Sequence, residues 1–203
     1  MLRLLLARHG QTDWNRDQRI VGLTDVPLND EGHRQAEALA RSLEHESMVA
    51  IYSSPLSRAL HTAQDIAVCH AMEVRVAEHL REMDSGDGEG LRGPEFRQRY
   101  GHILAMGSQV RFPNGESLSE VQDRCWSVVE DIRCCHGSGT VVVVSHALVT
   151  LCIIYKALKL DLGRWGSMRV DPGSKSILEL GPNGPRLSLF NDTCHLSEAK
   201  VGS

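Results

Sequence analysis

The chain has 203 residues, a length that fits one domain with a substantial hydrophobic core. Its net charge of −4 and its aromatic content of 4% argue against nucleic-acid binding, which favours a basic surface and stacking side chains. The sequence has no run of transmembrane length, and its six cysteines follow no disulfide or zinc spacing, so we expect a cytoplasmic protein with no membrane partner.

The first third of the chain alternates between strand and helix patterns. The apolar run Leu2–Ala7 predicts a buried strand, and Asn29 predicts the N-cap of a following helix. A second strand is expected over Met48–Tyr52. Apolar residues at helical spacing then predict a helix over Leu56–Ala67, and Glu73–Ala77 alternates like a strand.

The periodic pattern fails from Asp84 to Gly115, where glycine, charged and turn residues are frequent. We expect this stretch to form a lid-like segment. Order returns at Ser117–Glu120, a capping box that predicts a helix. The inward positions of that helix are expected to be Val121, Cys125, Val128, Val129 and Ile132.

The remaining elements complete an α/β pattern. Val141–Val144 is strongly β-prone and is followed by an apolar helix through Leu158. Ser176–Leu180 and Arg186–Phe190 flank a turn-rich linker and predict a hairpin, whose nearby prolines place it at a sheet edge. We therefore predict a single domain over 1–203. Its fold is a three-layer αβα sandwich with a mostly parallel sheet of roughly six strands and an antiparallel edge strand.

Several polar side chains follow the ends of predicted strands. Folds of this class bind ligands beyond the carboxyl ends of their strands, so these residues are expected to share one rim. They are Arg8-His9, Ser53-Ser54, Glu82 and Ser145-His146.

This set of residues is suited to phosphoryl transfer. Such a reaction needs fixed cations around the phosphoryl oxygens, a nucleophile in line with the leaving group and a proton donor for the departing oxygen. Arg8 and Arg58 can clamp a phosphate, and a neutral His9 can attack phosphorus. Glu82 can serve as the general acid. The set is chemically complete without a metal or another cofactor.

Each residue also has an ordinary structural explanation. A histidine near a strand end is usually a satisfied polar group, and Arg58 or Glu82 alone would be read as a solvated surface charge. His146 alone would be read as the cap of the next helix. The joint position of these residues at one rim is what favours a catalytic interpretation.

The motifs resemble those of the histidine phosphatase superfamily, also called the phosphoglycerate mutase-like family. The resemblance extends over nearly the whole chain. Its segments are Leu6-Ala7-Arg8-His9-Gly10-Gln11-Thr12-Asp13-Trp14-Asn15, Tyr52-Ser53-Ser54-Pro55-Leu56-Ser57-Arg58-Ala59 with Thr62-Ala63, Glu82 to Gly90, Pro113-Asn114-Gly115-Glu116-Ser117, Val143-Val144-Ser145-His146 and a tail at Asn191–Leu196.

The resemblance implies a role for each matching residue. His9 is expected to be the nucleophile, with Arg8, Arg58 and His146 stabilising the phosphoryl group and Glu82 donating a proton. Asn15 and the backbone near Gly22 are expected to add donors to the phosphate.

Three positions depart from the family pattern. Val21 stands where many members have glutamine, Gly88 where tryptophan is common and Ala147 where glycine is frequent. The first removes a side-chain donor and the second is expected to loosen the loop around Glu82. The third would be costly if the backbone there were left-handed.

Within the family, the sequence favours a phosphatase. Bisphosphate-primed mutases carry an insertion that shields the phosphohistidine from water, and the segment between Gly90 and Phe112 shows no match to it. The alternatives are a phosphoglycerate mutase and, less favoured, a noncatalytic phosphate-binding module, which would be expected to have lost a catalytic group. We expect a small phosphomonoester substrate of open identity (α-ribazole phosphate, phosphoserine, a sugar phosphate or phosphoglycerate) and a monomer or homodimer.

Overall fold

The computed structural model describes residues 1–198; the end of the predicted domain, residues 199–203, lies outside the described residues. One six-stranded sheet runs through the centre, in the order β3-β2-β4-β1-β5-β6. Its strands are β1 Leu2–Arg8, β2 Met48–Ser53, β3 Val74–Val76, β4 Gly139–Ser145, β5 Lys175–Gly181 and β6 Gly184–Asp192. The helices are α1 Asp13–Arg16, α2 Asp30–Ser42, α3 Ser57–His70, α4 Gly93–Leu104, α5 Leu118–Cys135, α6 Ala147–Ala157 and α7 Cys194–Glu198.

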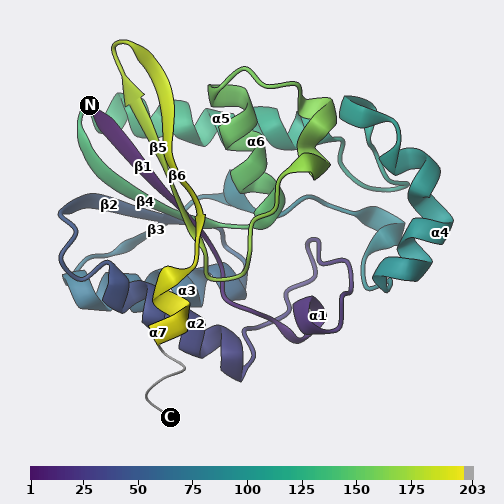
Figure 1. Cartoon of the computed structure of the whole chain (residues 1–203), viewed down its shortest axis with the longest axis horizontal. Coiled ribbons are helices and arrows are strands. Elements are labelled where there is room, and N and C mark those ends of the chain that lie inside the picture. The colour runs from purple at the N-terminus through teal and green to yellow at the C-terminus, as the bar shows by residue number, and fades with distance from the viewer. Residues whose placement is uncertain (199–203) are drawn as a thin grey trace.

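The sheet matches the predicted architecture. Strands β3, β2, β4 and β1 pair in parallel, whereas β5 runs antiparallel to both β1 and β6. The hairpin of β5 and β6 forms one edge of the sheet, as predicted. Strand β5 is the inner strand of the hairpin and pairs with β1, and β6 is the edge strand. Helices α2 and α3 cover one face of the sheet, and α5 and α6 cover the other (Figure 1).

Alternating side chains of the central strands supply two separate cores. Leu4, Val141 and Val143 face α5 and α6, whereas Leu5 and Val142 face α2 and α3. Because both faces are buried, these strands are continuously apolar, as expected of a parallel sheet. All of the predicted inward residues of α5 are buried.

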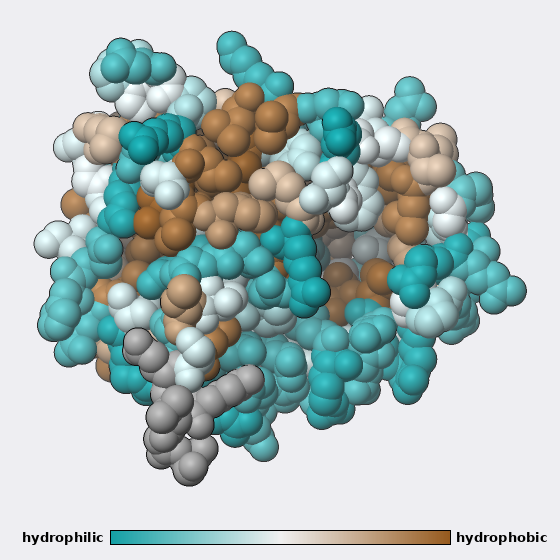
Figure 2. All heavy atoms as spheres, viewed as in Figure 1, coloured by the Kyte–Doolittle hydropathy of each residue, from teal (hydrophilic) through white to brown (hydrophobic). Residues whose placement is uncertain are grey.

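Helix α4 lies inside the stretch that we expected to lack regular structure. Phe96, Tyr100 and Ile103 share its buried side, and Phe96, Tyr100 and Phe112 stack on one another with ring centroids 5.0 to 5.8 Å apart. Glycine, arginine and histidine between these positions hid the period in the sequence. The helix stands at one side of the molecule, and the surface is hollowed between it and the sheet (Figures 1 and 2). Within the described residues, no helix is long and apolar enough to cross a membrane.

Candidate active site

Two histidines follow two adjacent parallel strands. Arg8 at the end of β1 is in register with Ser145 at the end of β4, and the backbone N–H of His9 donates to Ser145 O at 3.0 Å. His9 and His146 therefore emerge side by side, with ring centroids 5.1 Å apart in an edge-to-face arrangement. Both are almost completely buried. The structure therefore places His9 and His146 together at one edge of the sheet, as predicted.

The ring of His9 is held in one orientation. Its Nδ1 lies 2.6 Å from the carbonyl oxygen of Gly10, which can only accept, so Nδ1 carries the proton and Nε2 keeps its lone pair. Burial, reinforced by the charges of Arg8 and Arg58, holds the pKa of His9 well below its ordinary value. The ring is therefore neutral and its Nε2 can act as a nucleophile.

His146 is also buried and neutral. Burial and the nearby Arg58 charge hold its pKa well below the ordinary value. Its Nε2 lies 2.8 Å from the hydroxyl of Ser54, so the segment that carries Arg58 also orients this ring. Its Nδ1 has no hydrogen-bond partner within the described part of the chain.

The two arginines enter from different elements. Nη1 of Arg8 donates to Val170 O at 2.6 Å, and Arg58, in the first turn of α3, donates to Gly22 O and Thr24 O at 2.9 and 3.0 Å. Burial lowers the pKa of Arg8 to about 10 and also lowers the pKa of Arg58. A pKa of about 10 is still far above 7, so Arg8 remains charged at neutral pH. The Nε atoms of both have no partner among residues 1–198, as expected of donors that serve a ligand.

Glu82 differs from the other carboxylates of its loop. Burial raises its pKa, against the opposing effects of a hydrogen bond from Met83 N and the charges of Arg58 and Arg8. A carboxyl that holds its proton more tightly suits a general acid. Two other carboxylates of this segment could be considered as the acid, but both have other partners. Asp84 accepts from Gly86 N, and Glu89 accepts from Leu23 N and Thr24 N.

A partly buried ion pair near Glu82 was missed by the sequence reasoning. Arg124 on α5 contacts Glu116 at 2.8 Å and donates to the carbonyl oxygens of His79, Arg81 and Glu82. Glu116 in turn accepts from Asp84 N at 3.0 Å. The pair therefore holds the backbone on both sides of the acid. Glu116 stood within a family motif, but nothing in the spacing pointed to Arg124.

The two predicted phosphate-binding positions are partly engaged by the protein itself. The side-chain oxygen Oδ1 of Asn15 accepts from Thr12 N at 3.0 Å in a capping box at the start of α1, which leaves the Nδ2 group of Asn15 to donate. The carbonyl oxygen of Gly22 accepts from Arg58. Their roles toward a phosphate stay predictions.

Two departures from the family pattern prove to be accommodated. A methyl group at Gly88 would lie 2.6 Å from Cε2 of Phe96, so the aromatic ring of α4 fills the space beside this glycine and the loop is packed. The expected loosening is therefore not seen. Ala147 begins α6 and is not among the residues with positive φ, so alanine fits there without strain. Val21 is partly exposed.

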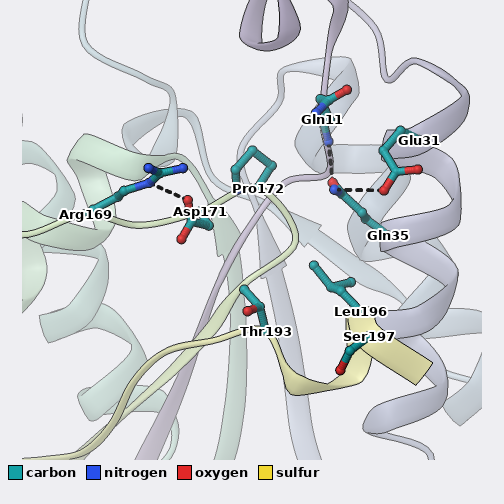
Figure 3. A pocket seen from close by; sticks show the side chains of 9 residues that line it. All are labelled: Gln11, Glu31, Gln35, Arg169, Asp171, Pro172, Thr193, Leu196 and Ser197. Carbon is teal, nitrogen blue, oxygen red and sulfur yellow. Dashed lines mark hydrogen bonds and ion pairs between the residues drawn. The ribbon is translucent and has the colours of Figure 1, made fainter. Parts of the chain in front are cut away.

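A cavity of about 480 Å³ lies between the 169–172 segment, the start of α2 and the tail (Figure 3), and its lining includes none of Arg8, His9, Arg58, Glu82 and His146. Arg169 and Asp171 form an ion pair on one side of the cavity. On the other side, the side-chain oxygen Oε1 of Gln35 accepts from Gln11 N at 2.9 Å. Arg169 also acts electrostatically on Arg8. His195 of the tail faces Gly173 O at 2.9 Å.

Across residues 1–198, no group of three or more His, Cys, Asp or Glu side chains is arranged to hold a metal ion. The positive charge around the two histidines comes from Arg8 and Arg58. The arrangement combines a neutral imidazole nitrogen on His9, fixed cations and a carboxyl on Glu82 whose pKa is raised. These are the kinds of group that phosphoryl transfer requires.

Comparison with known proteins gives matches over nearly the whole chain. Residues 4–193 match the family model of the histidine phosphatase superfamily (branch 1). Phosphoserine phosphatase 1 of Hydrogenobacter thermophilus is 34% identical over 205 residues, which cover 99% of this chain and 97% of the relative. The phosphoserine phosphatase of Entamoeba histolytica, solved in complex with 3-phosphoglyceric acid, superposes with a TM-score of 0.88 at 30% identity, over 97% of this chain and all of that one. A putative alpha-ribazole-5'-P phosphatase of Escherichia coli gives 0.86 at 26% identity, over 94% and 96% of the two chains.

Proposed function

Because the chain belongs to the histidine phosphatase superfamily and is a phosphatase, we propose that it hydrolyses a small phosphomonoester through a phosphohistidine on His9. The observation that carries the proposal is the hydrogen bond between Nδ1 of His9 and Gly10 O. It fixes the tautomer whose Nε2 is free to attack. Family membership bears out the resemblance found in the sequence.

The mechanism follows from the charges of the site. Nε2 of His9 attacks phosphorus while Arg8, Arg58 and His146 hold the nonbridging oxygens. The bond from phosphorus to the leaving oxygen breaks, and Glu82 gives that oxygen its proton. The resulting Glu82 carboxylate then takes a proton from water as the water attacks the phosphohistidine, which releases inorganic phosphate and restores both groups.

Trapping of the intermediate tests this mechanism. A phosphohistidine survives alkali and is lost in acid. Enzyme that is quenched in alkali during turnover of p-nitrophenyl phosphate with a radiolabelled phosphate group should therefore carry the label. His9→Ala should carry none. Label on the His9→Ala protein would reject His9 as the nucleophile.

The fate of the phosphoryl group separates a phosphatase from a mutase. With water as acceptor, released phosphate should equal the substrate consumed. Faster interconversion of 2- and 3-phosphoglycerate, with or without a bisphosphate primer, would instead identify a mutase with the same nucleophile.

We further propose that the substrate carries a carboxylate, as phosphoserine and 3-phosphoglycerate do. Arg169 supports this, because its side chain is 84% exposed beside its ion pair with Asp171, it lines the cavity described above, and its charge contributes to lowering the pKa of Arg8. Arg169→Gln should raise KM for phosphoserine roughly tenfold, equivalent to the loss of one charge-assisted hydrogen bond. KM for p-nitrophenyl phosphate, which has no carboxylate, should stay unchanged. Equal KM changes for both substrates, or a preference for α-ribazole 5'-phosphate over phosphoserine, would argue against this substrate class.

A further inference from the structure

Glu89 fixes the short loop formed by residues 22–24. One carboxylate oxygen accepts from Leu23 N at 2.6 Å, and the other accepts from Thr24 N at 3.0 Å and from the Thr24 hydroxyl at 2.6 Å. Hydrogen bonds to an ionised acceptor are stronger than those between neutral groups. The carboxylate of Glu89 therefore orients the backbone N–H groups of the loop.

The same loop holds Arg58 through its carbonyl groups. Gly22 O accepts from Nη2 at 2.9 Å and Thr24 O accepts from Nη1 at 3.0 Å. Gly22 O and Leu23 N belong to one peptide unit, whose C=O and N–H point in opposite directions. Glu89 and Arg58 therefore form hydrogen bonds to opposite edges of the same rigid peptide unit, Glu89 to its N–H and Arg58 to its C=O.

Gly22 shows how closely the carboxylate approaches the loop. A methyl group on its Cα would overlap Oε1 of Glu89, so only glycine permits the contact. The two segments are also joined by backbone hydrogen bonds, since Ile20 N donates to Leu91 O at 2.9 Å and Gly90 N donates to Ile20 O at 3.0 Å. Those bonds bring the segments together. The side chain of Glu89 sets the direction of the peptide units at 22–24.

We infer that Glu89 is a positioning residue that aims the Arg58 guanidinium at the phosphoryl group. The inference rests on the proposed function, in which Arg58 binds that group. Arg58 is fully buried, and each of its Nη atoms gives one N–H to a loop carbonyl. The guanidinium is planar, so fixing these two contacts fixes the direction of its remaining donors. Without Glu89, the loop carbonyls and the guanidinium lose their set direction together.

Vanadate binding tests the inference, because vanadate reports on the phosphoryl pocket and has no leaving group. Glu89→Ala should weaken vanadate binding and lower kcat/KM by roughly 10- to 100-fold, as expected of a small displacement of a catalytic group. The loss should be equal for aryl and alkyl phosphates. Asp87→Ala is the matched control, because Asp87 lies two residues before Glu89, is exposed, and its side chain accepts a hydrogen bond from Asn114 instead of from the 22–24 loop; this variant should match the wild type.

A double-mutant cycle with Arg58 separates positioning from a general structural role. In an Arg58→Ala background, Glu89→Ala should cause almost no further loss of vanadate affinity. Full additivity, or a Glu89→Ala protein that melts earlier but binds vanadate normally, would overturn the inference. If Glu89→Ala does not fold, Gly22→Ala perturbs the same loop and should weaken vanadate binding, whereas unchanged binding would contradict the inference. Absence of a phosphohistidine in the wild-type protein would reject the proposed function, whereas normal turnover by Glu89→Ala would reject only this inference.

Discussion

At the scale of single residues, the site pushes its ionisable groups in opposite directions. Burial lowers the pKa of His9 and His146 and raises that of Glu82. The histidine rings therefore keep a free lone pair to lower pH than an ordinary histidine, and Glu82 keeps its proton to higher pH than an ordinary carboxyl. Two groups whose environments move their pKa values apart in this way are suited to act as base or nucleophile and as acid.

The assignment of Glu82 as proton donor predicts a dependence on the leaving group. Glu82→Gln should lower kcat/KM by roughly 10²- to 10⁴-fold for alkyl phosphates, whose leaving oxygen needs a proton. Aryl phosphates with acidic leaving groups should lose much less. Equal losses for both classes would point to a binding or structural role for Glu82.

The pH profile checks the same assignment. A general acid is active in its protonated form, so under this assignment kcat/KM for an alkyl phosphate should fall as pH rises through the raised pKa of Glu82. Glu82→Gln should lose this limb. Any limb that persists in Glu82→Gln belongs to another group, such as the phosphate of the substrate itself, whose second pKa is about 6.

At the scale of elements, α5 reaches across to the segment that carries Glu82. Arg124 is 10% exposed and Glu116 is 18% exposed, and burial alone would raise the pKa of Glu116. The hydrogen bonds from Arg124 and Asp84 reverse the effect, so the pKa of Glu116 is lowered and the carboxylate is ionised.

Arg124→Met should lower the free energy of unfolding by about 3 kcal/mol, because it leaves a mostly buried carboxylate without its partner. It should also lower kcat more for alkyl than for aryl phosphates, since the carbonyl oxygens of Arg81 and Glu82 lose their donor. Urea unfolding and the two substrates measure these effects. Arg133→Met is the control, because Arg133 lies on the same helix in an exposed pair with Glu130 and should change stability by less than about 0.5 kcal/mol. An Arg124→Met protein with proportional losses for both substrates would show that the pair supports the fold alone.

The elements also show how far a sequence can be read. Asn29 and Ser117 cap α2 and α5 as predicted, because N-caps depend on local hydrogen bonds. The apolar run of β4 and the adjacent positions of His9 and His146, which follow the paired strand ends Arg8 and Ser145, are consequences of the parallel pattern. Helix α4 escaped because its few buried aromatics contact residues distant in the sequence, such as Phe112. Arg124 escaped for a related reason: its partners are backbone carbonyls more than 40 residues away, and no side-chain pattern marks them.

At the scale of the whole molecule, the proposed catalytic histidines lie at the ends of two strands that contribute to both cores. Strands β1 and β4 bury apolar residues on both faces and end at the two histidines. The histidines are therefore buried by the same packing that stabilises the sheet. Activity and global stability should consequently depend on pH through the same two residues.

The sign of that dependence follows from the lowered pKa values of His9 and His146. Both rings are neutral in the folded protein, whereas in the unfolded chain they take up protons below about pH 6.5. The unfolded state therefore binds more protons, and the free energy of unfolding should fall as pH drops below about 6.5, by up to about 1.4 kcal/mol per pH unit for each ring. Glu82 acts in the opposite direction, because its pKa is raised on folding. The informative quantity is thus the difference in slope between the wild type and His9→Asn, measured by urea unfolding from pH 7.5 to 5.5. Phosphate buffers must be avoided because a bound anion would stabilise the folded state. His9→Asn should lose the share of the slope that belongs to one histidine, and substitution of the exposed His45 should not. An identical slope for His9→Asn and the wild type would mean that His9 is protonated in the folded protein, which would also remove its lone pair as the nucleophile.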